Sequence, residues 1–137
     1  MCATLRRATR ALTQLYDDEL RPTGLRATQF TILQALDLAG PVNQKRLGQI
    51  LGMDSTSLTR ALEPLSRQGW IERERGEDRR EWRFQLSPAG KAQFHLALPR
   101  WQRLQQRLQK QLGPQLWTGV MQTANQLTAT LPQGEAQ

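Results

Sequence analysis

Residues 47–60, LGQILGMDSTSLTR, decide the fold of this chain. Apolar residues recur at helical spacing on both sides of the Gly52-Met53 pair: Leu47, Ile50 and Leu51 before it, and Leu58, Ala61, Leu62 and Leu65 after it. This layout is typical of helix-turn-helix units, in which a glycine permits the tight turn and apolar residues hold two helices at a steep angle. Asp54 or Ser55 can cap the second helix, because either side chain can accept hydrogen bonds from its first backbone amides.

The second helix of this unit has a polar face opposite its apolar one. Its members are small hydroxyl residues and one arginine: Ser55, Thr56, Ser57, Thr59 and Arg60. Hydroxyl groups can reach phosphates or base edges in a major groove, and arginine can bind guanine with two hydrogen bonds. The alternative interpretation is an ordinary solvated helix face.

The hydrophobic period changes to two after Gly69. Trp82, Phe84 and Leu86 alternate with polar residues, which predicts a two-stranded hairpin with one face buried. The hairpin tip is too polar to pack inside and should project as a wing, with four charged residues as candidate DNA contacts: Arg75, Asp78, Arg79 and Arg80. A tip arginine can enter a narrow minor groove while Asp78 holds the loop or a guanidinium in place. The alternative is a solvated, charged tip.

Helical patterns flank this unit on both sides. We expect a first helix of about twenty residues that ends near Pro22, and a second helix over 27–39 that ends at Gly40-Pro41. Ser87-Pro88 begins a further helix, Gly113-Pro114 ends it, and a last helix reaches residue 131, before a frayed end over 132–137. The pattern predicts a mainly α, winged-helix (α+β) fold of about six helices with a two-stranded β wing.

The composition restricts the class of protein. The chain has 137 residues, which suits a single domain over 1–137, and its net charge of +7 favours a polyanionic partner such as nucleic acid. One cysteine and one histidine permit neither an intrachain disulfide nor a Cys/His zinc cluster, and we expect no cofactor. No apolar run approaches the roughly 20 residues of a membrane span, and the first ten residues are too polar for a secretory signal. We therefore expect a cytoplasmic protein with no membrane partner.

Five runs of residues carry a resemblance to a known family: 24–30 (GLRATQF), 47–60 (LGQILGMDSTSLTR), 65–71 (LSRQGWI), 78–80 (DRR) and 86–90 (LSPAG). Together they resemble the multiple-antibiotic-resistance regulator (MarR) family. The resemblance implies a triangular dimer in which the first and last helices of both chains interleave, and two winged lobes that read a roughly palindromic site. It also implies that the polar face of the second helix-turn-helix helix faces the major groove, and that Asp78 and Arg80 match the family's wing aspartate and arginine.

The same resemblance divides the chain into a DNA-binding lobe over 28–88 and dimerisation helices over 1–22 and 89–131. Hydrophobic periodicity supports the dimer independently. The apolar stripes of the first and last helices exceed what so short a chain can bury internally, and pairing would cover them.

Four residues are candidates for an effector site. Cys2 lies 14 residues before Tyr16, and organic-hydroperoxide-sensing members of the family carry a reactive cysteine and a tyrosine at matching positions. A second tyrosine usual in those sensors is Arg6 here, so the alternative is a small, inert cysteine. His95 and Trp101 fall near the level of the family's ligand crevice, with a surface role for His95 and core packing for Trp101 as the alternatives.

The sequence therefore predicts a homodimeric DNA-binding transcription regulator, a repressor released from a pseudo-palindromic operator by an effector. The expected effectors are a small phenolic or aromatic ligand or an organic hydroperoxide. An enzyme is not expected, because the chain shows neither a nucleophile with a base nor a pair of tuned carboxylates. The alternative is a winged-helix module for nonspecific, architectural DNA binding or for protein contact, which would lack preference for one site.

Overall fold

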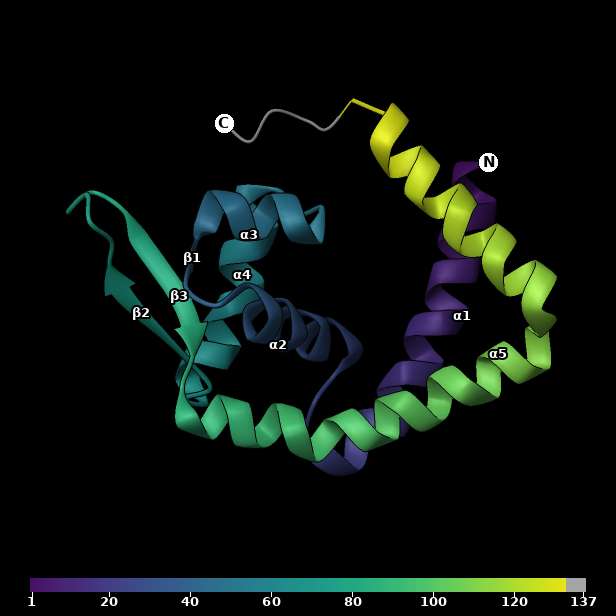
Figure 1. The fold of residues 1–137 in the computed structure, drawn as a ribbon, viewed down its shortest axis with the longest axis horizontal. Helices are drawn as coiled ribbons and strands as arrows, with labels where there is room; N and C mark the ends of the chain where they lie inside the picture. Colours follow the sequence, from purple (N-terminus) through teal and green to yellow (C-terminus); the bar gives the residue numbers. More distant parts are fainter. Residues whose placement is uncertain (133–137) are drawn as a thin grey trace.

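The computed structural model describes residues 1–132, and the elements follow the expected order (Figure 1). They are α1 (Cys2–Leu20), the 3-10 helix η1 (Arg21–Thr23), α2 (Ala27–Ala39), β1 (Val42–Asn43), α3 (Gln44–Leu51), α4 (Ser55–Arg67), β2 (Ile71–Arg75), β3 (Trp82–Leu86) and α5 (Pro88–Thr130). The predicted mainly α, winged-helix class is confirmed. The predicted single domain over 1–137 and the predicted frayed end both include residues 133–137. These residues lie outside the described part of the chain.

The sheet has three strands where the sequence predicts two. Its order is β1-β3-β2, all antiparallel, and β1 pairs Val42 with Phe84 and Asn43 with Arg83. A strand of two residues is too short to show a period-two pattern. The sequence therefore indicates only the end of one helix and the start of the next in this segment. Pairing with β3 fastens the start of α3 to the wing hairpin.

Most of the core lies in the lobe formed by α2, α3, α4 and the sheet, and residues of α1 and α5 complete it. Phe30, Leu33, Leu47, Leu58 and Leu65 are almost completely buried there. These residues recur at helical spacing along their helices, so each helix turns one apolar face inward. The core fixes how α4 and the wing stand relative to each other.

The start of α5 is determined by local signals. Ser87 is the N-cap residue, and its Oγ accepts a hydrogen bond from the backbone N of Gly90 at 3.0 Å. Pro88 occupies the first turn, where its missing amide costs no hydrogen bond. Gly90 lies so close to the lobe that an added Cβ would stand 1.8 Å from the carbonyl oxygen of Trp70. This contact joins the helix to the lobe.

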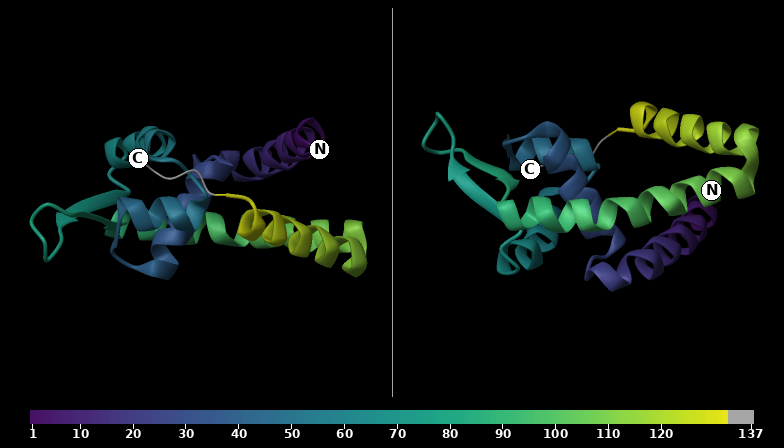
Figure 2. Two further views of the ribbon diagram at one scale, coloured as in Figure 1. Left: turned by 90° about the horizontal axis from the view of Figure 1, so that it is seen from above. Right: turned by 60° about the horizontal axis from the view of Figure 1, so that its bottom comes forward.

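The last two expected helices are the two arms of α5. Gly113 separates them with φ 78° and ψ 161°, a conformation that glycine adopts readily because it has no Cβ. Gly113-Pro114 therefore separates two helices that share the label α5, as the sequence predicts, and the chain bends sharply between them (Figure 1). The wing projects at one end of the molecule, whereas α1 and the second arm of α5, which we call the helical arms, extend to the other end (Figure 2).

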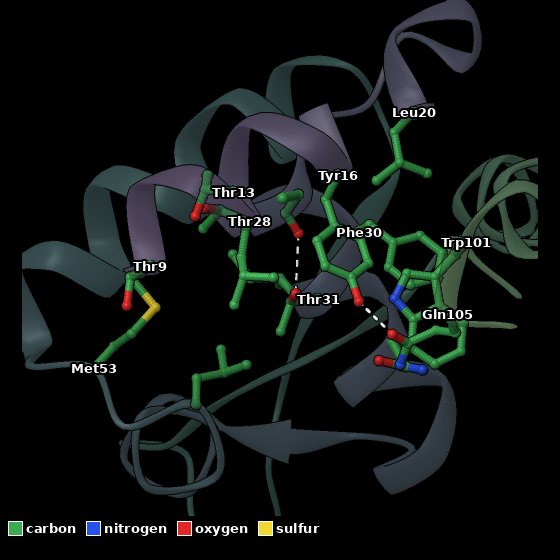
Figure 3. Close-up of a pocket in the computed structure, with 15 residues that line it drawn as sticks. Thr9, Thr13, Tyr16, Leu20, Thr28, Phe30, Thr31, Met53, Trp101 and Gln105 are labelled. Carbon is green, nitrogen blue, oxygen red and sulfur yellow. Dashed lines mark hydrogen bonds between the residues drawn. The ribbon is translucent and has the colours of Figure 1, made fainter. Parts of the chain in front are cut away.

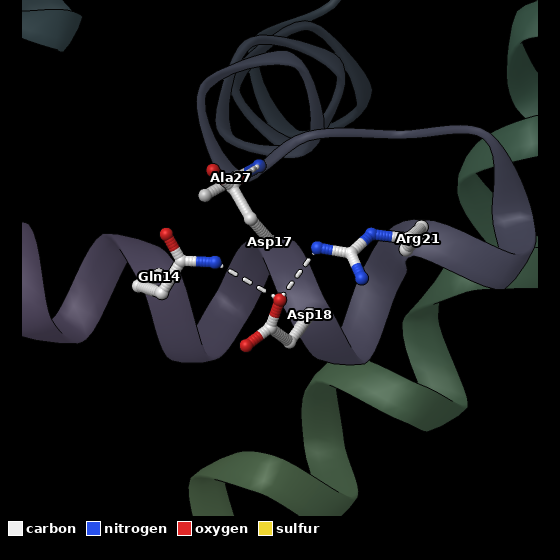
Figure 4. Close-up of polar contacts among 5 residues, drawn as sticks. All are labelled: Gln14, Asp17, Asp18, Arg21 and Ala27. Carbon is white, nitrogen blue, oxygen red and sulfur yellow. Dashed lines mark hydrogen bonds and ion pairs between the residues drawn. The ribbon is translucent and has the colours of Figure 1, made fainter.

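The acidic run 17–19 has structural contacts. Asp17 Oδ1 accepts a hydrogen bond from the backbone N of Ala27 at 2.7 Å, and so fixes the start of α2 against α1 (Figure 4). Asp18 accepts hydrogen bonds from Gln14 and Arg21 within its own segment. Glu19 forms an ion pair of 3.1 Å with Arg107 of α5. Two of the three acids therefore connect elements, and both are half-buried.

In the described part of the chain, no helix is both long enough and apolar enough to cross a bilayer.

Candidate nucleic-acid interface

The helix-turn-helix is formed by α3 and α4. Gly52 ends α3 in the left-handed region, with φ 64°. Asp54 caps α4, since its carboxylate accepts hydrogen bonds from the backbone N of Ser57 at 2.8 Å and from its hydroxyl at 2.9 Å. These hydrogen bonds, the backbone one foremost, lower the pKa of Asp54 below its ordinary value. The turn thus holds the first residues of α4 in place.

All five predicted recognition residues are exposed on α4, while Leu58, Leu62 and Leu65 of the same helix are buried. Two of the five already have partners within the chain. The hydroxyl of Ser57 donates to Asp54, and that of Thr59 donates to the carbonyl oxygen of Ser55 at 2.9 Å. Within residues 1–132, the side chains of Ser55, Thr56 and Arg60 form no hydrogen bond. These three are the side chains that are free to meet a ligand.

Gln44 is a site residue that sequence reasoning missed. Its Nε2 donates to Thr59 Oγ1 at 2.8 Å, so the first residue of α3 supports the exposed face of α4. The two residues are 15 positions apart, and their contact depends on how α3 and α4 cross. No local pattern in the sequence signals it.

The wing tip is a turn held by its own backbone. Gly76 N donates to the carbonyl oxygen of Glu81 at 2.9 Å, and Glu81 N donates to that of Asp78 at 2.9 Å. The carboxylate of Asp78 accepts from the backbone N of Arg80 at 3.0 Å, so it holds the loop, one of the two roles that the sequence left open. The structure brings Arg75, Asp78, Arg79 and Arg80 together as exposed residues at and beside the tip.

Asn43 connects the wing to the helix-turn-helix. Its Oδ1 accepts from the backbone N of Arg46 at 2.7 Å and so caps α3, and its Nδ2 donates to Glu81 Oε1 at the base of the wing tip. Glu81 is also 3.6 Å from Arg83 Nε. One amide side chain therefore fixes α3 and β3 relative to each other.

A cavity of about 600 Å³ lies between α1, α2, α5 and the helix-turn-helix (Figure 3). Tyr16 Oη donates to Gln105 Oε1 across it, and burial raises the pKa of Tyr16 above its ordinary value. Phe30 and Trp101 stack in the wall with ring centroids 5.5 Å apart. Met53, beside the turn of the helix-turn-helix, also lines the cavity, which therefore touches both the helical arms and the lobe.

The four predicted effector residues are not brought together. Tyr16 and Trp101 share the cavity just described, whereas His95 is exposed on α5 and lines neither this cavity nor the one beside Cys2. Cys2 is exposed at the start of α1, in a second cavity of about 520 Å³ with Arg6 and Leu127. Since 14 residues of α-helix span about 21 Å, Cys2 and Tyr16 of one chain do not meet.

No group of three or more His, Cys, Asp or Glu side chains within residues 1–132 is arranged to hold a metal ion.

The elements and the exposed face of α4 define the class of this protein as a winged helix-turn-helix protein. A model of the MarR family matches residues 25–82. The M. tuberculosis transcriptional regulator MosR, solved in complex with DNA, is 35% identical with a TM-score of 0.85, over 93% of this chain and 92% of that chain. A mutant of E. coli MarR complexed with operator DNA is 28% identical with a TM-score of 0.76, over 95% of this chain and 92% of that chain. The chain belongs to the MarR family, a family of transcription regulators and not of enzymes.

A curated relative is the uncharacterized HTH-type transcriptional regulator YwoH of Bacillus subtilis, 31% identical over 77 residues, which are 56% of each chain. The matched region thus spans little more than half the length of this relative. The family model, which matches residues 25–82, covers α4 and the wing as far as the start of β3.

Proposed function

We propose that the chain is a homodimeric, sequence-specific DNA-binding transcription regulator. The observation that carries the proposal is the joint exposure of the polar face of α4 and the charged wing tip on one lobe. The DNA complexes of MosR and E. coli MarR, which share this fold over almost the whole chain, support DNA as the partner. The net charge of +7 fits the same polyanion.

In this proposal the residues of α4 have two kinds of role. Ser55, Thr56 and Arg60 enter the major groove, where arginine can bind guanine through two hydrogen bonds. Ser57 and Thr59 hold the start of α4 in shape through their contacts with Asp54 and Gln44. In the wing, Arg79 and Arg80 approach the minor groove while Asp78 holds the turn.

The exposed apolar residues of the helical arms support the dimer. They lie on α1 and on the second arm of α5: Leu5, Leu12, Leu15, Leu116, Val120 and Met121, each 40–54% exposed. Apolar stripes on two neighbouring helices are costly to leave in water, and a symmetric partner would cover both. We therefore assign residues 28–88 to DNA binding, and 1–22 and 89–131 to dimerisation.

The cavity beside Tyr16 is the proposed effector site. Its described lining consists of aromatic, aliphatic, threonine and glutamine side chains, with no charged group. Such a lining favours a neutral phenolic or aromatic ligand over a carboxylate, because a buried carboxylate needs a cationic or multiple-donor partner. The cavity touches both the helical arms and the lobe, so a ligand can favour one position of the lobe relative to the arms. In the dimer this would change the spacing of the two lobes and release a repressor from its operator.

The test is fluorescence anisotropy of the full chain on a duplex that it selects from a random-sequence pool, beside a scrambled duplex. A regulator should prefer the selected duplex by a factor on the order of a thousand or more. A ratio near one would instead favour the architectural module.

Repeating the measurement with phenol, and then with cumene hydroperoxide and a Cys2→Ser control, separates the two effector classes. Release by phenol in both proteins supports the cavity. Release by the hydroperoxide only where Cys2 is present, reversed by thiol, supports an oxidant acting at the second cavity.

A further inference from the structure

Strand alternation gathers two arginines and a tryptophan on one face of the wing hairpin. In the register of β2 and β3, Arg75 is opposite Trp82, Arg73 is opposite Phe84, and Ile71 is opposite Leu86. Alternate residues of a strand and their direct cross-strand partners point to the same side of a sheet. Ile71 and Phe84 on this side are buried in the core beside α4, whereas Arg73, Arg75 and Trp82 continue the same side toward the wing tip.

Both guanidinium groups lie against the indole ring of Trp82. The Cζ atom of Arg75 is 3.9 Å from the ring centroid, and that of Arg73 is 4.2 Å from it. Both distances are well inside the range of a cation–π contact, in which the negative ring face attracts the cation. The alternating pattern of the sequence predicts Trp82 on the buried face of the hairpin. The structure places it half-buried and outside the core, where its ring contacts both guanidinium groups.

The charge on this face is not neutralised by the hairpin. Glu72 and Glu74 alternate with the arginines of β2 and therefore lie on the opposite face. The ion pair of the hairpin joins Glu81 to Arg83. Across residues 1–132, neither Arg73 nor Arg75 takes part in an ion pair, and both side chains are exposed.

Arg75 also contacts the wing tip, because its Nη1 donates to the carbonyl oxygen of Arg79. A guanidinium has five N–H donors along its edge, so a stacked face and one such hydrogen bond leave most donors available. The side chains of the two arginines are thus ordered, and most of their N–H donors remain available to a ligand.

We propose that Arg73 and Arg75 bind phosphates of the DNA backbone between the groove read by α4 and the groove approached by the wing tip, and that Trp82 is the residue that positions them. The inference rests on the proposed DNA-binding function and deepens it. Ordering two long side chains before binding removes part of the entropy that would otherwise be lost on contact with DNA. Because phosphates are the same at every site, the contact strengthens binding to all sequences.

The first test is the salt dependence of DNA binding by the full chain, on a selected duplex and its scrambled version. Each phosphate contact adds about 0.9 to the slope of log affinity against log salt concentration. Arg73→Gln and Arg75→Gln should each lower the slope by about 0.9 on both duplexes. Arg103→Gln, which removes an equal charge from an exposed position on α5, should leave it unchanged. Unchanged slopes for both wing variants would overturn the phosphate contacts.

The second test is a double-mutant cycle for Trp82. Trp82→Leu should weaken binding about 5-fold while the arginines are present, and have no effect once both are glutamine. Trp82→Phe should recover most of the loss. An equal loss in both backgrounds would mean that Trp82 only supports the hairpin, and no loss in either background would remove its role. Thermal unfolding of each variant identifies one that fails to fold, and the arginine variants still test the contacts in that case.

The two levels of the proposal fail separately. If the wild-type protein binds the selected and scrambled duplexes equally, the regulator proposal fails, while the slopes on either duplex still decide the arginine contacts. If the wild-type protein is specific and the slopes do not change, the regulator stands and this cluster is not part of its interface.

Discussion

At the scale of single residues, the polar face of α4 separates into side chains that hold the helix and side chains that are free. The hydroxyl of Thr59 accepts a hydrogen bond from Gln44 and donates one to the carbonyl oxygen of Ser55. The hydroxyl of Ser57 donates to Asp54, the N-cap residue of α4. Thr56 and Arg60 carry no such contacts within residues 1–132. Helical periodicity shows which residues share a face, but it does not show which of them are already engaged.

Tyr16 gives a prediction at this scale, because it is the one tyrosine of the chain. Burial raises the pKa of Tyr16 above 10.0 in the folded protein. The stability that goes with the neutral phenol is therefore complete below pH 10.0 and is lost as the pH rises through the folded-state pKa. Phenolate absorbance followed during a pH titration should have its midpoint above 10.0 when the protein is folded and near 10.0 in urea. Equal midpoints would mean that the hydroxyl is not enclosed by the cavity.

At the scale of elements, local signals predict boundaries well and long-range pairings poorly. Asp54 and Ser87 cap helices where the sequence indicates, because a cap depends only on residues within one turn. The strand β1 was not predicted, because its two residues form a strand only through pairing with β3. Gly113 was predicted as the break between two helices, and the structure gives it non-helical dihedral angles, because a glycine followed by a proline interrupts a helix locally.

Two glycines of α5 provide a matched pair of variants. Gly90→Ala should lower the free energy of unfolding by about 3 kcal/mol, because the new Cβ would overlap the backbone of Trp70 and force a shift. Gly119→Ala meets no atom within 4 Å and should raise it by about 0.5–1 kcal/mol through the better helix propensity of alanine. Urea unfolding at one protein concentration measures both. Similar stabilities for the two variants would show that α5 does not start against Trp70.

At the scale of the whole molecule, most of the exposed large apolar residues lie on the helical arms and few lie on the lobe. The wing and the arms project at opposite ends (Figure 2), which leaves the arms accessible to a second chain without covering α4. The sequence predicted this surplus of apolar surface. It could not locate the cavity beside Tyr16, because its walls come from α1, α2, α5 and the helix-turn-helix.

The dimer is testable with a matched pair of charged substitutions. Leu116→Glu introduces a charge on the second arm of α5, where Leu116 is 54% exposed, and should convert a dimer to a monomer in light scattering. Leu38→Glu introduces the same charge on α2, where Leu38 is 81% exposed, and should leave the dimer intact. A wild-type monomer at micromolar concentration, or dimers in both variants, would contradict the assignment of the arms.

The most direct test of the central claim, that α4 reads DNA bases, is selection from a random-sequence pool by the wild-type protein, Arg60→Gln and Arg80→Ala in parallel. The wild-type protein should select a two-fold symmetric site with half-sites about one helical turn apart. Arg60→Gln should lose the preference at one position in each half-site and keep the others, whereas Arg80→Ala should weaken binding to all sequences. An unchanged selection profile for Arg60→Gln, or no enriched site for the wild-type protein, would contradict the claim.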